Sequence, residues 1–345
     1  MEYSRILVRA TNWVGDAVMS LPALRALRER FPKAYIAILA LPTVADLYAR
    51  EPFCDRLIPY NAARGARDWT AKWRIARTLA PERFDCAILL QNAFEAALVA
   101  RLAGIPERIG YARDGRGWLL TRAIAVPGRG SIPRHERFYY LELLRRAGVL
   151  DKRPANGAIR LEGAGAARAV GIVRLAEAGL GENVIGISPG AAYGEAKRWL
   201  AERFAEAAVM VAQGLGARVA LFGSKDEREL CGEVQRMVEK RGIVARNLAG
   251  ETALGEFIEM AAACRVFLTN DSGGMHIASA LGVPTVAVFG ATDEEATGPT
   301  GPLARVVREP VECSPCLLRE CPIDHRCMTR VEARRVADAA LELLK

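Results

Sequence analysis

The chain has 345 residues, 51% of them hydrophobic, and a formal net charge of +8 at pH 7. This length predicts two domains of ordinary size, and the apolar fraction excludes an intrinsically disordered protein. No apolar run reaches the roughly 20 residues that cross a bilayer, and no signal peptide precedes the first strand pattern, so we expect a soluble cytoplasmic protein. Arginines concentrated in the N-terminal half favour a polyanionic partner such as nucleic acid, an anionic membrane or an acidic glycolipid, with a solvated basic face as the alternative.

Short aliphatic runs alternate with amphipathic stretches along the chain, a pattern that predicts parallel βα units. The expected strands are Ile6–Val8, Tyr35–Ala40, Cys86–Leu90, Ala123–Val126, Val184–Ser188, Val219–Phe222, Val266–Thr269 and Thr285–Phe289. The charged Pro/Gly segment 151–157 separates the two sets and is the expected linker. We therefore expect an α/β protein with two doubly wound domains, 1–157 and 158–345, facing each other across a cleft, with a C-terminal helix able to pack back on the first domain.

Asp16 follows the first expected strand, at the turn into a helix. Ligands of doubly wound sheets bind at the carboxyl ends of the strands, so this position lies at the ligand-facing end of the first βα unit. A carboxylate there can take a proton from an attacking hydroxyl group. The alternative is an acidic residue in the first helical turn that only stabilises the helix dipole.

An arginine-rich stretch, 64–77, contains Trp69 and Trp73 four residues apart. This spacing indicates either a segment that contacts lipid or sugar, or an ordinary amphipathic helix. Further along, His135 begins another helical pattern, where it either contacts a substrate or is a partly exposed structural histidine.

The loop Gly190–Lys197 leaves the fifth expected strand, and Arg198 follows it. Small residues followed by two cations suit a phosphate-binding loop, although the spacing is not that of a P-loop. The alternative is a surface turn with solvated cations.

The segment 269–276 joins the seventh expected strand to a helix and is the most informative stretch of the chain. A helix N-terminus presents unpaired N–H groups and a partial positive charge, which together stabilise an anionic ligand such as a diphosphate. Glycines let a ligand approach the backbone, and the polar side chains can hydrogen-bond hydroxyl groups. The alternative is an ordinary N-cap followed by a glycine turn. The candidate residues are Asp271, Ser272, Gly273, Gly274 and His276.

The eight cysteines fall into two groups. Four are scattered and are expected in the core: Cys54, Cys86, Cys231 and Cys264. The other four cluster in the tail with His325 among them: Cys313, Cys316, Cys321 and Cys327. Four thiolates this close can bind zinc, but their spacing is irregular, so we expect reduced thiols in an ordered loop anchored by a helix over 331–344 that buries Val336, Ala340 and Leu343. No aromatic-plus-basic module accompanies them, so we expect no nucleic-acid partner.

Five segments, in order along nearly the whole chain, resemble the bacterial ADP-heptose–lipopolysaccharide heptosyltransferases of glycosyltransferase family nine, most closely those of type II. The matching segments are Trp13–Asp16 before Leu21–Leu24, Gly104–Tyr111, Ala196–Trp199, Asn270–Gly273 with Met275 and His276, and the cysteine-containing tail. The resemblance implies the two-domain GT-B fold. It also implies inverting transfer of L-glycero-D-manno-heptose from ADP-heptose to the lipopolysaccharide inner core, as heptose II onto heptose I, with no divalent metal or other cofactor.

The resemblance also assigns roles to residues. Asp16 matches the general base and Lys197 the diphosphate contact, and Arg198 and the 271–276 loop belong to the donor site. Asp226 or Glu227 is the candidate for the adenosine ribose. Gly274 departs from the family pattern, in which a bulkier apolar residue is often found, so the shape of the sugar pocket there is open. The acceptor, a Kdo-containing lipid A core at the cytoplasmic face of the inner membrane, is expected at Asn12, Trp13, Arg64, Arg67, Arg113 and His135.

Two other functions stay open from the sequence. One is transfer from the same donor to another core acceptor, as in heptosyltransferases of type I or III. The other is a catalytically idle protein on this fold that binds a nucleotide or a glycolipid.

Overall fold

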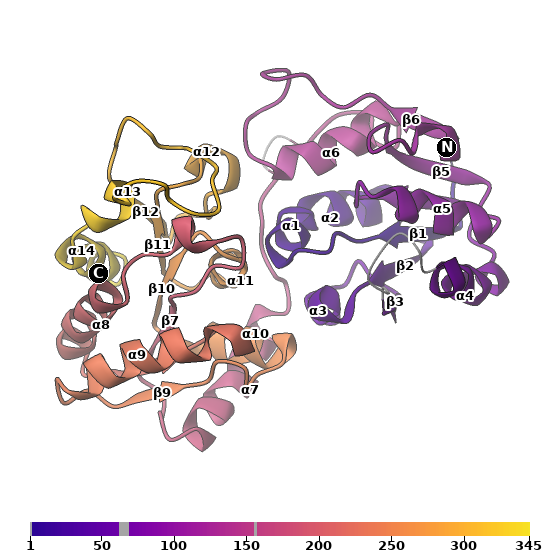
Figure 1. The fold of residues 1–345 in the computed structure, drawn as a ribbon. Coiled ribbons are helices and arrows are strands. Elements are labelled where there is room, and N and C mark those ends of the chain that lie inside the picture. The colour runs from indigo at the N-terminus through magenta and orange to yellow at the C-terminus, as the bar shows by residue number, and fades with distance from the viewer. Residues whose placement is uncertain (1, 62–68, 155–156) are drawn as a thin grey trace. The chain divides into compact units, whose positions relative to one another are not determined.

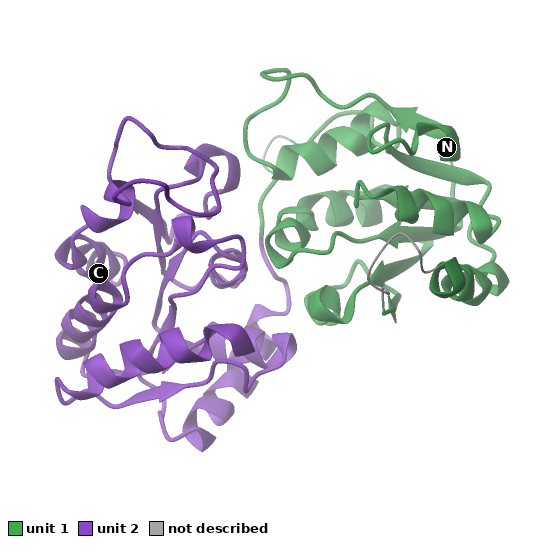
Figure 2. Ribbon diagram, in the orientation of Figure 1, with its two compact units in different colours: residues 1–159 green, residues 160–345 purple. Residues whose placement is uncertain are grey.

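The computed structural model describes residues 2–61, 69–154 and 157–345. The chain divides into two compact units, residues 1–159 and 160–345 (Figure 2). Each unit is built around one six-stranded sheet in which every pairing is parallel (Figure 1). The α/β class with two doubly wound sheets, expected from the sequence, is confirmed. The expected linker 151–157 includes residues 155–156, which lie outside the described residues.

The first sheet has the strand order β3-β2-β1-β4-β5-β6. Its strands are β1 Arg5–Arg9, β2 Tyr35–Ala40, β3 Arg56–Pro59, β4 Cys86–Leu89, β5 Glu107–Tyr111 and β6 Arg122–Ile124. The helices of this unit are α1 Val14–Met19, α2 Leu21–Arg30, α3 Pro42–Ala45, α4 Trp69–Leu79, α5 Phe94–Leu102 and α6 Arg137–Arg146, with short 3-10 turns at Ala80–Glu82 and Gly117–Leu119. The chain runs outward from β1 in one direction and then resumes at β4 in the other, so the loops after β1 and β4 diverge and leave a crevice at the carboxyl end of the sheet.

The second sheet repeats this plan with the order β12-β11-β10-β7-β8-β9. Its strands are β7 Val184–Ser188, β8 Arg218–Leu221, β9 Ala245–Asn247, β10 Val266–Asn270, β11 Thr285–Phe289 and β12 Ala304–Arg308. The helices are α7 Ala164–Glu177, α8 Ala201–Leu215, α9 Arg228–Glu239, α10 Leu254–Ala263, α11 Gly273–Ala280, α12 Glu294–Thr297, α13 Arg326–Thr329 and α14 Ala333–Glu342, with 3-10 turns at Glu195–Lys197 and Lys225–Glu227. The strand order reverses between β7 and β10, which places the loops after those strands beside one another.

Helix α14 closes one side of the second unit by packing against α8 and against strands β10 to β12. Val336 and Ala340 are fully buried, as expected, because they lie four residues apart on the same face of the helix. Leu343 follows the last helical residue and is only half-buried. Within the described parts of the chain, no helix is both long and apolar enough to cross a bilayer.

Candidate active site

The first unit contains a cavity of about 420 Å³ at the carboxyl ends of β1 and β4. Four of the residues predicted from the sequence line it: Asn12, Trp13, Asp16 and Arg113. His135 does not line the cavity, although its neighbour Glu136 does, and its Nδ1 atom accepts a hydrogen bond from the Arg137 N–H at 3.2 Å. Arg64 and Arg67 lie outside the described residues.

Asp16 lies in the first turn of α1, where the crevice between β1 and β4 opens. The hydroxyl of Tyr140, from α6, donates a hydrogen bond to its Oδ1 atom at 3.2 Å. Burial, and then the charge of Asp16, raise the pKa of Glu136 in the same cavity. The cavity therefore holds one carboxylate oriented by a tyrosine and a second carboxyl group that binds its proton more tightly than usual, which is chemistry suited to accepting a proton.

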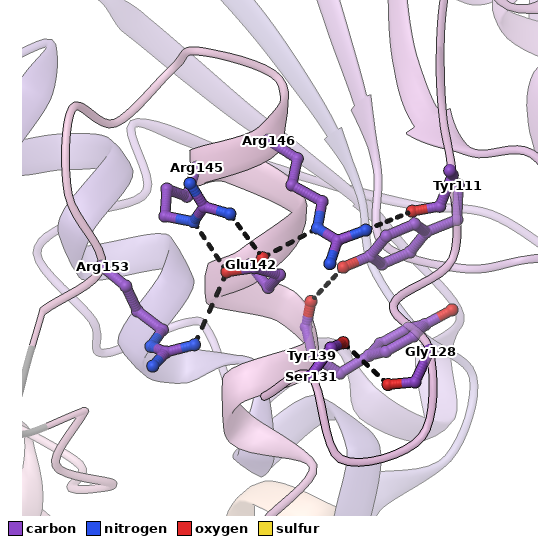
Figure 3. Close-up of polar contacts among 9 residues, drawn as sticks. Tyr111, Gly128, Ser131, Tyr139, Glu142, Arg145, Arg146 and Arg153 are labelled. Atoms are coloured by element: carbon purple, nitrogen blue, oxygen red, sulfur yellow. Dashed lines mark hydrogen bonds and ion pairs between the residues drawn. The ribbon is translucent and has the colours of Figure 1, made fainter. Parts of the chain in front are cut away.

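Helix α6 and the N-cap residue before it bring Glu136, Tyr139 and Tyr140 to the cavity. Figure 3 shows the polar contacts around Glu142, a buried residue of the same helix. Glu142 of α6 accepts hydrogen bonds of 2.7–2.9 Å from the guanidinium groups of Arg145 and Arg146, and Nη1 of Arg153 lies 3.6 Å from its Oε2 atom. The hydrogen bonds from Arg145 contribute most to lowering the pKa of Glu142 to about 2.

Two further hydrogen-bonded groups shape the cavity wall. The hydroxyl of Tyr111 donates to the carbonyl oxygen of Tyr139 at 2.8 Å, which ties β5 to α6. The fully buried Arg116 donates to the carbonyl oxygens of Gln91 and Ala93 in the loop after β4, and to the Asn92 side chain. Burial lowers the pKa of Arg116 to about 10.

Sequence reasoning missed Glu136, Tyr139, Tyr140 and Arg116. A usable signal for the first three was the run of polar and aromatic residues that begins at His135, from which only the histidine was selected. Arg116 gave no signal, because an arginine in a loop is usually exposed.

In the second unit, Nζ of Lys197 lies 2.6 Å from Oδ2 of Asp271. The same oxygen accepts a 2.6 Å hydrogen bond from the hydroxyl of Thr292. These residues come from the loops after β7, β10 and β11, three strands that are neighbours in the sheet. Asp271 is buried and Lys197 half-buried, so each charge depends on the other for compensation.

Asn270 fixes the loop that carries Lys197. Its side-chain amide donates to the carbonyl oxygen of Pro189 at 2.7 Å, and its Oδ1 atom accepts from the Trp199 N–H at 3.0 Å. The indole of Trp199 is buried and donates to the carbonyl oxygen of Val331 at 3.1 Å. The end of β10 therefore holds the loop after β7 on both sides of Lys197.

The cysteine-containing tail supports the same loop from outside. The Ala196 N–H donates to the carbonyl oxygen of Arg319 at 2.9 Å, and Nε2 of His325 lies 3.1 Å from the Ala196 carbonyl oxygen. A Cβ atom at Gly194 would lie 2.3 Å from the Arg319 oxygen, so only glycine permits this approach. The sequence did not predict that the tail contacts the Lys197 loop.

None of the four tail cysteines forms a disulfide bond. Burial, and then the thiolate charges of the other three tail cysteines, raise the pKa of Cys327 to about 11. In the described ranges no group of three or more His, Cys, Asp or Glu side chains has an arrangement that would hold a metal ion.

Helix α11 begins at Gly273, directly after Ser272, which is its N-cap. The Ser272 hydroxyl accepts a hydrogen bond from the Met275 N–H at 3.4 Å. Ser272 is therefore the N-cap of this helix, as the alternative interpretation of the sequence expected. His276 is buried in the second turn of the helix. A Cβ atom at Gly274 would lie 3.4 Å from the Ser188 hydroxyl, which is an ordinary contact. The space around this position therefore does not require glycine.

Of the two acidic residues considered after β8, Glu227 lies nearer the Lys197 loop. Its Oε2 atom accepts hydrogen bonds from the N–H and the hydroxyl of Ser224, at 2.8 and 3.0 Å. Its Oε1 atom lies only 1.9 Å from where a Cβ at Gly190 would be, so Glu227 packs directly on that loop. Asp226, by contrast, is exposed. In the Lys197 loop itself, Nη1 of Arg198 lies 3.8 Å from Oε1 of Glu195.

Comparison with known proteins identifies the family that this chain resembles along nearly its whole length. The model of glycosyltransferase family 9 (heptosyltransferase) matches residues 72–326. Lipopolysaccharide heptosyltransferase 2 of Escherichia coli (strain K12) is 33% identical over 309 residues, 88% of this chain and 88% of its own. The solved structure of E. coli ADP-heptose lps heptosyltransferase II has a TM-score of 0.82 and 30% identity, covering 99% of this chain and 98% of its own. E. coli heptosyltransferase WaaC, solved with ADP, has a TM-score of 0.73 at 18% identity over 98% of this chain and 99% of its own, a likeness of fold alone. The expected GT-B fold is confirmed.

Proposed function

The chain belongs to glycosyltransferase family 9, the heptosyltransferases, and we propose from this that it transfers L-glycero-D-manno-heptose from ADP-heptose to the lipopolysaccharide inner core, adding heptose II to heptose I. The observation that carries the proposal is the pairing of this family membership with the carboxylate of Asp16 in the cavity of the first unit, held by the Tyr140 hydroxyl. The first unit binds the acceptor in this proposal, and the second binds the donor.

The donor diphosphate binds between the Lys197 loop and the start of α11. An ammonium group has three N–H donors, and one of those of Lys197 is directed at Asp271, so the others can reach phosphate oxygens. The partial positive charge at the N-terminus of α11 adds to that attraction. Arg198 is near enough in sequence to contribute a second cation.

The adenosine ribose binds at Glu227. This carboxylate packs against Gly190 at the start of the Lys197 loop, so a nucleotide whose phosphates contact that loop has its ribose within reach. One carboxylate oxygen is held by Ser224, which fixes the direction of the other. Asp226 is exposed and is not used in this proposal.

Transfer inverts the anomeric configuration. Asp16 removes the proton of the acceptor hydroxyl as that oxygen attacks the anomeric carbon, on the face opposite the departing ADP. Negative charge accumulates on the diphosphate as the bond to the sugar breaks, and Lys197 with the α11 N-terminus stabilises it. Because fixed cationic groups provide this stabilisation, the reaction needs no divalent metal and no other cofactor.

The acceptor is an anionic glycolipid, a Kdo-containing lipid A core, which binds at the cytoplasmic face of the inner membrane. Asn12, Trp13 and Arg113 line the cavity that holds Asp16 and provide hydrogen bonds, an aromatic surface and a positive charge. Arg64 and Arg67 remain acceptor contacts predicted from the sequence. His135 also remains a predicted acceptor contact, next to Glu136, which lines the cavity.

The test is incubation of the purified protein with ADP-heptose and a panel of truncated lipopolysaccharide cores, with mass spectrometry of the products. The proposal expects one heptose to be added to the core that ends in a single heptose. Transfer only to the heptose-free core, or only to a core that already has two heptoses, would assign a different acceptor. Binding of ADP-heptose with no transfer to any core would indicate a non-catalytic protein.

A further inference from the structure

Helix α4 of the first unit exposes two of the five tryptophans of the chain. Trp69 is 58% exposed and Trp73 53%, whereas Trp199 in the second unit is 1% exposed. Together with Leu102 at the end of α5, which is 45% exposed, they line a surface cavity of about 750 Å³. An apolar patch of this kind on a soluble unit usually marks a surface that contacts a partner.

The cavity is lined by two adjacent stripes of the same helix. Trp69, Trp73 and Arg77 are four residues apart and form one stripe, and Thr70, Arg74 and Thr78 form the next. Ala76 and Leu79, three residues apart, form the buried edge of the helix and pack into the core of the unit. Helix α4 is therefore anchored through small and aliphatic residues while its large aromatic side chains point outward.

The exposed side of α4 is positively charged. The helix contains Lys72, Arg74 and Arg77 and has no Asp or Glu between its ends. The Arg77 guanidinium lies 4.6 Å from the centroid of the Trp73 ring. Across the residues that the structure describes, neither Arg74 nor Arg77 forms an ion pair with a carboxylate. The patch thus presents aromatic surface and cationic groups side by side.

We propose that this face of α4, extended by Leu102, docks on the surface of an anionic phospholipid bilayer. Tryptophan prefers the headgroup level of a membrane, where its ring is in an apolar environment and its N–H is hydrated, and arginine can extend its apolar stem there while its guanidinium binds a lipid phosphate. The inference deepens the proposed function and rests on it, because an enzyme whose acceptor is anchored in a membrane must work at that surface.

Charge favours a lipid surface over a second copy of this chain. In a symmetric dimer the same patch faces itself, so the cations of one α4 would lie against those of the other. A bilayer with anionic headgroups instead supplies the opposite charge over the whole area of the patch.

The experiment measures binding of the full chain to large unilamellar vesicles, either phosphatidylcholine alone or phosphatidylcholine with 30% phosphatidylglycerol as a chosen composition. The variants are Trp69→Ala/Trp73→Ala and Arg74→Glu/Arg77→Glu. Two controls lie on an exposed face of α7 in the second unit: Val170→Ala/Val173→Ala for lost apolar area, and Arg168→Glu for reversed charge. Thermal melts confirm that each variant is folded.

Cosedimentation should show that the wild type binds the anionic vesicles, that binding weakens in high salt, and that each α4 variant reduces the partition coefficient by roughly tenfold or more. The α7 controls should bind like the wild type. Equal binding to both kinds of vesicle, or unaltered binding of both α4 variants, overturns the proposal, as does a dimer in gel filtration that the α4 variants dissociate.

A second measurement separates docking on lipid from direct contact with the acceptor. Heptose transfer is measured on a delipidated, water-soluble core and on the same core carried by lipid A in vesicles. The α4 variants should keep the wild-type kcat/KM on the soluble core and lose activity on the vesicle-bound core. Loss on the soluble core as well would make the patch part of the acceptor site and overturn the proposal. A wild type inactive on both substrates, but bound to anionic vesicles, would refute the transferase assignment and leave the lipid-binding result standing.

Discussion

Lys197 and Asp271 form a 2.6 Å ion pair between loops that follow two neighbouring strands, β7 and β10. The two residues are 74 positions apart in the chain. The sequence named both as donor-site residues for separate reasons, one as a cation after a loop of small residues and the other as a polar residue before a helix. Their contact brings the two loops together, and in the proposed mechanism Asp271 positions the cation that the donor diphosphate needs.

Replacing Lys197 should weaken binding of the donor. Lys197→Ala removes the cation and leaves the buried Asp271 carboxylate uncompensated, so we expect the affinity for ADP to fall by roughly 10- to 100-fold. Isothermal titration calorimetry measures this directly. Lys240→Ala, at the exposed residue that follows α9, is the matched control and should bind ADP like the wild type. Unchanged ADP affinity in Lys197→Ala would remove this residue from the donor site.

Substitutions can show whether Glu227 or Asp226 binds the ribose. Glu227→Gln should lower the affinity for ADP by about 5- to 10-fold, because a hydrogen bond from a hydroxyl group to a carboxylate is stronger than one to an amide. The same variant should lose most of the preference for ADP over 2′,3′-dideoxy-ADP, and Asp226→Asn should retain it. If Asp226→Asn loses that preference and Glu227→Gln keeps it, the two roles are reversed.

The strands show where sequence patterns were sufficient. All eight expected strands are present, and three of them, Tyr35–Ala40, Val184–Ser188 and Thr285–Phe289, have the predicted bounds. These three strands lie inside their sheets and are almost wholly buried, so their sequences are nearly continuous apolar runs.

Four strands were missed, and each has a physical reason. β3, β9 and β12 are edge strands with partly exposed residues, so polar side chains interrupt the apolar pattern. β5 begins with Glu107 and Arg108, whose side chains contact Arg122 of β6 and the carbonyl oxygen of Leu119 in the preceding 3-10 turn. Such contacts come from the fold itself and leave no periodic signal in the sequence.

The candidate site was predicted unevenly for a similar reason. Asp16, Lys197 and Asp271 lie in the connections that follow strong strand patterns, so the topology of a doubly wound sheet located them at the carboxyl ends of the strands. Tyr140 and Glu136 reach the same cavity from a helix more than 100 residues after Asp16, and nothing local to them indicates that contact.

The network around Glu142 predicts a pH dependence of stability. The pKa of this carboxyl group is about 2 in the folded protein, below its ordinary value near 4.3 in an unfolded chain, so its stabilising contribution is complete above roughly pH 5 and is lost as the pH falls toward 2. Glu142→Gln should lower stability at pH 7 by about 2 kcal/mol, measured by urea unfolding, and should flatten the decline between pH 5 and 2. An unaltered profile in this variant would mean that Glu142 does not contribute to acid unfolding.

Removing metal ions should leave both stability and activity intact. The tail cysteines are irregularly spaced, and the tail is anchored by the buried residues of α14 and by its hydrogen bonds to the Lys197 loop. Elemental analysis should find no stoichiometric zinc, and EDTA should change neither the melting temperature nor the rate of heptose transfer. One zinc per chain that survives gel filtration, together with a lower melting temperature after chelation, would establish a structural metal site instead.

The central claim is that Asp16 is the base that activates the acceptor, and the turnover of Asp16→Asn on ADP-heptose and the heptose I core tests it most directly. The substitution keeps the size of the side chain and its contact with Tyr140 while removing the capacity to take a proton. We expect kcat to fall by roughly 10²- to 10⁴-fold with little change in ADP affinity. A kcat within a fewfold of the wild type would contradict the mechanism.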